Sequence, residues 1–220
     1  MNGTTTLTTD DELLGIRLMH RAMRTDLHRL ATTAAELARD DCPSLRRITA
    51  LSDYLLLLAT SIDTHHRIED DELWPLLHTA VGPHIDLSEL ADDHAALESL
   101  LEELTADAHD LKAGGSGALT RVSGTLAQLR DMLDEHIDDE ERTVFPLITG
   151  HVSSAQWSRV DVIARGHLRL DFDMPRTMAV ASGPEKKLLV KGGFKDNPLL
   201  SIVLPVLAVK HRRRERAVFG

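Results

Sequence analysis

Apolar residues in the first 150 positions recur at alternating steps of three and four, the period of an amphipathic α-helix rather than of a strand. Four stretches carry this pattern, at residues 13–37, 48–76, 87–111 and 122–147. They are bounded by capping or helix-breaking residues, namely Thr9 or Asp10, residues 40–43, Ser44, residues 81–83, Ser88, residues 114–117 and Gly150. The pattern predicts an all-α fold in which four antiparallel helices form an up-down-up-down bundle.

Beyond Gly150 the periodicity weakens. Residues 153–168 suit a short helix, and the remaining tail is expected to be irregular. We therefore expect a bundle over residues 1–150 that carries the chemistry, and a C-terminal extension over residues 151–220 that packs on the bundle or on a partner.

One apolar run stands out in the extension, at residues 199–209, followed by the basic segment 210–216. Its eleven residues are too few to span a bilayer, which takes about 20. We expect a terminal helix that docks on the bundle, and contact with a membrane surface is the alternative. Docking would bury Leu199, Leu200, Ile202, Val203, Leu204, Val206 and Leu207.

Composition narrows the picture further. Aromatic residues make up only 3% of the chain, so the core is built from aliphatic side chains, which favours helices. The single Cys42 excludes an internal disulfide framework and a thiolate-rich zinc site, and no signal peptide is visible, so a cytoplasmic location is expected. Residues 171–220 carry a net charge of +5 and residues 1–170 a net charge of −15, which argues against nucleic acid as a partner.

Six polar residues occupy positions of the apolar stripes where the pattern predicts Leu: His20, His65, Glu69, His94, His136 and Glu140. Their heights along an antiparallel bundle agree to within a turn or two. Each would cost several kcal/mol if buried without a partner, which a fold stable by about 5–15 kcal/mol cannot bear. Four imidazoles and two carboxylates suit two first-row metal ions, so the pattern predicts a di-metal site. No organic substrate pocket is evident.

The two halves of the bundle repeat each other. The segment HHRIED leads to LWPLL, and HIDDEE leads to VFPLI at a constant offset of 71, while His20 and His94 are offset by 74. Each half thus offers one lone His and one His-x-x-x-Glu pair, whose members lie on one helix face. We expect His20 and His65 mainly on one ion, His94 and His136 mainly on the other, and both glutamates shared.

These segments, with His20 in HRAMR and Asp93-His94, resemble the hemerythrin-like (HHE cation-binding) four-helix bundles over residues 10–150. The resemblance implies a non-haem di-iron centre, oxo- or hydroxo-bridged, that binds dioxygen, peroxide, nitric oxide or iron itself. The chain has Glu98 and Glu141 where oxygen carriers have His and Asp. Fewer imidazoles make a harder site, closer to the iron-sensing and peroxide-handling branches than to an oxygen store.

The leading hypothesis is therefore binding of, or reaction with, small oxygen and nitrogen species in oxidative stress, with catalase-like peroxide consumption if the protein is an enzyme. An iron or redox sensor stabilised by its metal is the alternative, followed by oxygen storage or an inert structural bundle. Manganese or zinc suits the same ligands, and a homo-oligomer is left open. His66, Asp70, Glu98 and Glu141 are candidates to join the metal shell, and surface exposure is the other interpretation of His66.

Overall fold

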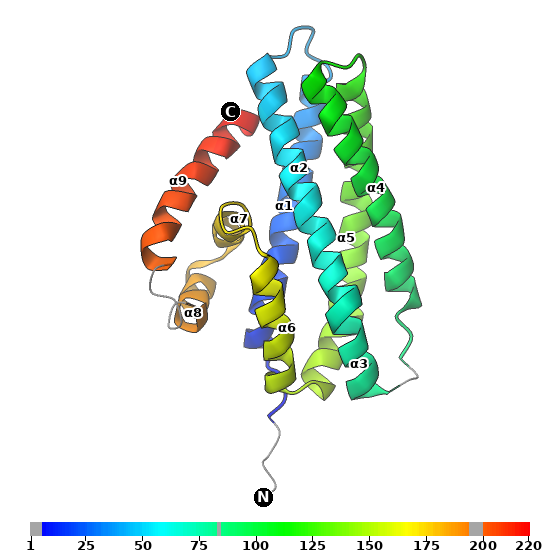
Figure 1. Cartoon of the computed structure of the whole chain (residues 1–220), viewed down its shortest axis with the longest axis vertical. Coiled ribbons are helices and arrows are strands. Elements are labelled where there is room, and N and C mark those ends of the chain that lie inside the picture. Colours follow the sequence, from blue (N-terminus) through cyan, green and yellow to red (C-terminus); the bar gives the residue numbers. More distant parts are fainter. Residues whose placement is uncertain (1–5, 83–84, 194–199) are drawn as a thin grey trace, which may run out of the picture.

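The computed structural model describes residues 6–82, 85–193 and 200–220 and is built from helices (Figure 1). The chain begins with a 3₁₀ turn η1 (Asp10–Leu13) and continues as α1 (Leu14–Leu37), α2 (Leu45–Ile68), a π-helical turn η2 (Glu69–Leu73), α3 (Trp74–Val81), α4 (Ser88–Ala113) and α5 (Ala118–His151). The extension forms α6 (Ser154–His167), α7 (Asp173–Val180), α8 (Gly183–Gly193) and α9 (Leu200–Phe219). The predicted all-helical class is confirmed.

The long helices α1, α2, α4 and α5 lie side by side, with α5 against α1 and α4, and α4 against α2 (Figure 1). Their apolar faces form two separate clusters. One extends from Met23 and Ile62 toward the end where α1 meets α2, and the other gathers Leu13, Trp74 and Phe145 at the opposite end. The polar residues singled out above fall between these two clusters.

Local signals set most of the helix ends as predicted. Thr9 caps η1, and its backbone N–H donates to Glu12 Oε2 at 2.8 Å. The predicted cap at Ser88 is wrong, because Ser88 is the first residue of α4. The N-cap position is Leu87, which has no capping side chain, and Asp86 just before it accepts from the backbone N–H of Ser88 at 3.0 Å and from the Ser88 hydroxyl at 2.7 Å. Pro83, part of the predicted stop signal, lies outside the described residues.

The second apolar stretch is not one continuous α-helix, because η2 interrupts it between α2 and α3. Pro75 lacks the N–H for an α-helical bond, and its ring crowds the carbonyl of Asp71, a conflict that a wider turn relieves. Pro146, at the matching position of the second half, is accommodated inside α5 without a break. Such π-turns are frequent at functional sites, and this one begins at Glu69.

The expected terminal helix is confirmed as α9, but the expectation of an irregular tail before it is wrong, because the extension also forms α7 and α8. Helix α7 packs on α1, and α9 packs on α2 and α7. These partners are distant in sequence, so local periodicity did not reveal them. No helix among the described residues is long and apolar enough to cross a bilayer.

The apolar run does not dock as expected. Val203 and Val206 are 40% and 67% exposed, Leu204 and Leu207 are half-buried, and Leu199 and the side chains of Leu200 and Ile202 lie outside what the structure describes. The far half of α9 docks instead. There Val218 is fully buried, and Arg29 of α1 stacks on the Phe219 ring at 3.8 Å.

Helix α7 does more than cover the outside of the bundle, because Arg176 enters the core between α1 and α2. Its side chain is 2% exposed. Nη1 donates to Asp26 Oδ2 at 2.9 Å, and Nη2 donates to the Ser61 hydroxyl at 3.1 Å. The Tyr54 hydroxyl donates to the other oxygen of Asp26 at 3.0 Å, which completes a buried polar network that fastens the extension to the bundle.

Replacing Arg176 with Met should therefore strongly destabilise the protein. The change leaves the Asp26 carboxylate buried without its cation, which costs about 3–5 kcal/mol in the free energy of unfolding. Denaturant unfolding checks this, with Arg159→Met, an exposed arginine on α6, as the control expected to change stability by less than about 0.5 kcal/mol. A loss below 1 kcal/mol for Arg176→Met would contradict the fastening role.

Acid should loosen α9. Burial is the main cause that lowers the pKa of His211; the charge of Glu215 opposes it, and the charges of Arg214, Arg176 and Arg29 add to the lowering. A histidine whose folded pKa is depressed stabilises the fold above its unfolded value of about 6.5, and this stability is lost as the pH falls. Hydrogen exchange of α9, corrected for intrinsic rates, should show less protection at about pH 5.5 than at about pH 7.5. His211→Asn should flatten this dependence, whereas the exposed His167→Asn should not.

Candidate metal centre

The structure brings the six predicted residues together in one layer of the bundle. His20 comes from α1, His65 from α2, Glu69 from η2, His94 from α4, and His136 and Glu140 from α5. Five of them are no more than 5% exposed, and His65 retains 14% of its side-chain surface. The two apolar clusters close the layer above and below, so water can approach these polar groups only from the sides.

The first group of side chains that could hold a metal ion is His20, His65, Glu69 and Glu140. The Nε2 atoms of His20 and His65 are 3.0 Å apart, and His20 Nε2 is 3.3 Å from Glu140 Oε2. His65 Nε2 is 3.1 Å from Glu69 Oε1. Two ligands at right angles on an ion about 2.1 Å away would stand about 3 Å apart, so this spacing fits a shared cation.

The second group is His66, Glu69, His94 and His136. The Nε2 atoms of His94 and His136 are 3.2 Å apart, and His94 Nε2 is 3.6 Å from Glu69 Oε2. The His66 ring stacks on His94 with centroids 4.4 Å apart. His66 is 5% exposed, so the interpretation that placed it on the surface is wrong.

A comparison of the two sequence halves could have located His66. At the offset of 71, His66 corresponds to Ile137, which is 1% exposed and belongs to the larger apolar cluster. A histidine at the position of a core isoleucine points inward. The two halves therefore contribute unequally, because only the first one has an imidazole at this position.

Glu69 faces both groups, with Oε1 toward His65 and Oε2 toward His94. Neither its oxygens nor those of Glu140 have a hydrogen-bond partner of normal geometry, and the same holds for His66 Nε2. Burial, then the charges of Glu140 and Asp70, raise the pKa of Glu69 well above its ordinary value. Five orphaned buried atoms facing one another fit a pair of cations, which would compensate them.

Burial favours the neutral form of His65, His66, His94 and His136, which is the form that metals bind. Burial, with neighbouring histidines, lowers the pKa of His136 to about 3. The same causes lower the pKa of His65 and of His66 well below their ordinary value.

Outer carboxylates orient three of the rings. The Nδ1 atom of His20 lies 2.9 Å from Glu141 Oε1, that of His94 lies 2.8 Å from Asp70 Oδ1, and that of His136 lies 3.4 Å from Asp93 Oδ2. With the proton on Nδ1, each ring turns its Nε2 lone pair to the centre.

The three other carboxylate candidates for the metal shell, Asp70, Glu98 and Glu141, lie in different places. Asp70 and Glu141 stand behind the rings rather than among the grouped ligand atoms. Burial would raise the pKa of Glu141, but its hydrogen bond with His20 and the charges of His20, Arg17 and Arg24 together lower it. Glu98 is 57% exposed and faces Arg67 instead of the centre.

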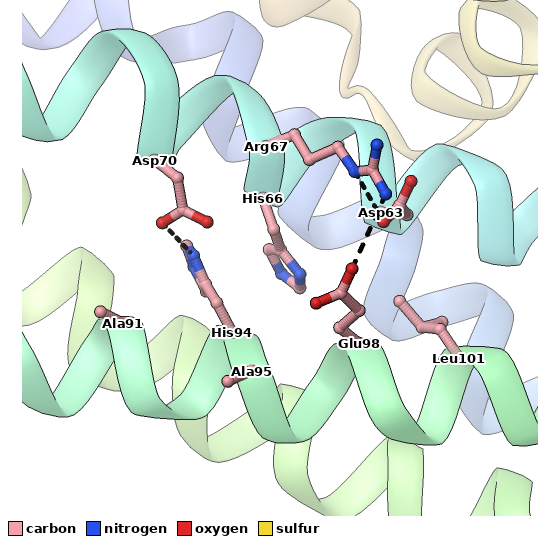
Figure 2. Close-up of a pocket in the computed structure, with 9 residues that line it drawn as sticks. All are labelled: Asp63, His66, Arg67, Asp70, Ala91, His94, Ala95, Glu98 and Leu101. Atoms are coloured by element: carbon pink, nitrogen blue, oxygen red, sulfur yellow. Dashed lines mark hydrogen bonds and ion pairs between the residues drawn. The ribbon is translucent and has the colours of Figure 1, made fainter.

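A small polar cavity of about 240 Å³ opens between α2 and α4 onto the second group. Figure 2 shows His66 and His94 reaching into this space, with Asp70 on His94 and Arg67 between Asp63 and Glu98. Arg67 Nε lies 3.1 Å from Asp63, and Nη2 lies 3.7 Å from Glu98. The cavity gives small hydrogen-bonding molecules a route to His66 and His94.

A larger cavity of about 570 Å³ opens onto the first group, where His65 and Glu69 form part of its lining. Its remaining walls come from α1 and α2 of the bundle on one side and from the extension on the other, and the periodicity of the bundle does not reveal the second side. The sequence shows no sign of a pocket for an organic molecule, whereas the structure contains a cavity of this size.

Comparison with known proteins agrees with this arrangement. A family model described as "Hemerythrin HHE cation binding domain" matches residues 15–148, which include both groups of candidate ligands. Searches of curated proteins and of solved structures gave no match.

Proposed function

The chain belongs to the hemerythrin HHE cation-binding domain family, whose members are helical proteins that bind metal ions, usually iron, and from this premise we propose that it holds two iron ions and reacts with small oxygen species, peroxide foremost. The observation that carries the proposal is Glu69, a buried carboxylate without hydrogen-bond partners whose two oxygens face two different groups of imidazoles. A bridging carboxylate is the natural role for such a residue.

In the ligand set that we propose, His20, His65 and Glu140 bind one ion, and His66, His94 and His136 bind the other, with Glu69 between them. This differs from the sequence-based expectation in two ways. His66 joins the ligands, and Glu140 serves one ion because its grouped partners all belong to the first set. The up-down-up-down topology supports this set, because it carries both halves of the repeat to the same level.

The choice of peroxide no longer rests on the ligand count, because His66 raises the number of imidazoles to five. It rests on the small cavity, where Asp63, Arg67, Asp70 and Glu98 surround the approach to His66 and His94. Charged and hydrogen-bonding walls favour a ligand that forms hydrogen bonds, as peroxide does, over apolar dioxygen. Reversible oxygen storage is accordingly less favoured.

Two iron ions, when bound, supply the paired one-electron changes that two-electron peroxide chemistry requires. The chain's own residues hold the geometry. Asp70 and Glu141 keep the Nδ1 protons of His94 and His20 in place, so that neither ring can turn its proton toward the centre. The Arg67 guanidinium, held by Asp63, stands at the cavity wall as a donor to an incoming oxygen atom.

An iron sensor is a second candidate, and the five orphaned buried atoms favour it. Without ions, those atoms cost free energy in the folded state only, so metal binding and folding are strongly linked. A cytoplasmic protein responding to iron supply would use that linkage to report on it.

Metal content tests the ligand set. Iron-loaded protein should contain about two iron ions per chain, Glu69→Gln should lose most of both, and Glu140→Gln or His66→Asn should lose about one. The exposed Glu98→Gln should lose none. Elemental analysis after desalting gives these numbers. Wild-type protein with well under one metal per chain would refute the site, and equal losses in Glu69→Gln and Glu140→Gln would mean that both glutamates bridge.

Peroxide should change the absorption spectrum of the iron-loaded protein, and the protein should consume the added peroxide over many turnovers. Stopped-flow spectra and an oxygen electrode follow the two signals. Glu69→Gln should lose both and Glu98→Gln should keep both. An unchanged spectrum with peroxide and with nitric oxide would leave only an inert structural metal.

Thermal melting with and without a chelator separates reactive site from sensor. If metal loss opens the bundle, the midpoint should fall by about 10 °C or more, which corresponds to several kcal/mol for a chain of this size. A fall of only a degree or two would argue against sensing through folding. Glu98→Gln should behave as wild type in both conditions.

A further inference from the structure

The larger cavity lies between the bundle and the extension. Its walls are α1 and α2 on one side and α6, α7 and α8 on the other, and we call it the extension cavity. Figure 1 shows α6, α7 and α8 on the side of the bundle where α1 and α2 lie. Its volume of about 570 Å³ falls within the range of about 300–1,000 Å³ that small-molecule sites occupy.

The extension cavity is held open by a built frame. On one side, the indole N–H of Trp157 in α6 donates to the backbone carbonyl of Glu12 at 3.0 Å. On the other, Arg176 fastens α7 to Asp26 and Ser61. The two anchors fix the separation of the walls, so the space between them is not a loose surface groove.

Apolar side chains dominate the walls. They include Leu14, Ile16, Met19, Ile68, Val160 and Met174. Met178 adds a third methionine, and methionine side chains adapt their shape to different apolar ligands. Such a lining favours a largely apolar organic molecule over water-like ligands.

At its inner end the cavity reaches His65 and Glu69. His65 keeps 14% of its side-chain surface although it lies in the core layer, and the cavity is the space beside it. The small polar cavity instead touches His66 and His94. The two groups thus have separate approaches, and charged side chains make up a larger share of the lining in the smaller cavity.

Charge narrows the class of ligand. The lining includes Asp11, Glu12, Asp161 and Asp173, besides Glu69. Asp161 is paired with Arg165, and Asp173 is paired with Arg176. Asp11, Glu12 and Glu69 therefore remain against Arg169, which itself lies 4.0 Å from Asp171. The excess of acidic groups disfavours an anionic ligand.

We propose that the extension cavity binds a neutral, largely apolar organic molecule whose single hydroxyl or hydroperoxyl group lies against His65 and Glu69. Binding requires neither bound ions nor turnover, so it goes beyond the proposed function and can be tested independently of it.

A methionine-labelled protein provides the test. The full-length chain with ¹³C-methyl methionine is titrated with 1-octanol, both metal-free and zinc-loaded to avoid paramagnetic broadening. The signals of Met19, Met174 and Met178 should shift saturably, because these side chains line the cavity. Those of Met23 and Met132, in the larger apolar cluster, should not. Shifts spread over all methionines, or none at saturating octanol, would overturn the proposal.

Two matched comparisons sharpen the result. Octanoate has the same chain with an anionic head, and it should bind at least tenfold more weakly; equal or tighter binding would refute the neutral class. Ala164→Phe fills the cavity and should weaken octanol binding at least tenfold, whereas Ala155→Phe, on the exposed side of α6, should leave it unchanged. Unweakened binding to Ala164→Phe would place the octanol elsewhere, and the methionine shifts of the wild type decide the question even if that variant fails to fold.

Discussion

The structure depends on one electrostatic constraint. A layer of carboxylate and imidazole side chains, several of whose polar atoms have no hydrogen-bond partner, lies buried between two apolar clusters. Glu69 and Glu140 offer four oxygens without hydrogen bonds, and His66 offers a free nitrogen. Leucines at the same positions would make a continuous core and a more stable apo bundle. With ionisable groups in this layer, the fold is intrinsically less stable but can hold cations. Asp70 and Glu141 orient the rings of His94 and His20 so that each Nε2 faces the centre.

The internal repeat makes the layer nearly symmetric, and the two halves differ at the positions that shape the surroundings of Glu69. His66 stands where the second half has Ile137, and the π-turn that begins at Glu69 has no counterpart in α5. Both differences fall in the first half, and both act on the region around Glu69. As a result, one carboxylate faces two groups of imidazoles, while Glu140 faces one. The approaches differ as well, because a polar cavity touches His66 and His94, whereas an apolar one touches His65.

The extension is part of the molecule's core rather than an appendage. Phe172 and Val218 belong to the larger apolar cluster, and Arg176 satisfies Asp26 inside the bundle. The same helices leave a lined space beside His65. Anchoring and cavity formation are therefore two results of one packing arrangement, in which α7 binds through a buried charge network at one point and leaves an opening next to it.

The sequence by itself determined the helical class, the position of the polar layer and the six residues at its centre, because periodicity and a broken apolar stripe are local properties of the chain. Only the tertiary structure decided which of the two matched prolines, Pro75 or Pro146, lies beside a wider turn, and where a cavity opens beside His65. It also showed that α9 docks through Val218 rather than through Val206. Each of these depends on which distant helix lies opposite a given side chain, and burial and cavity volume are set by such pairings, which no local pattern encodes.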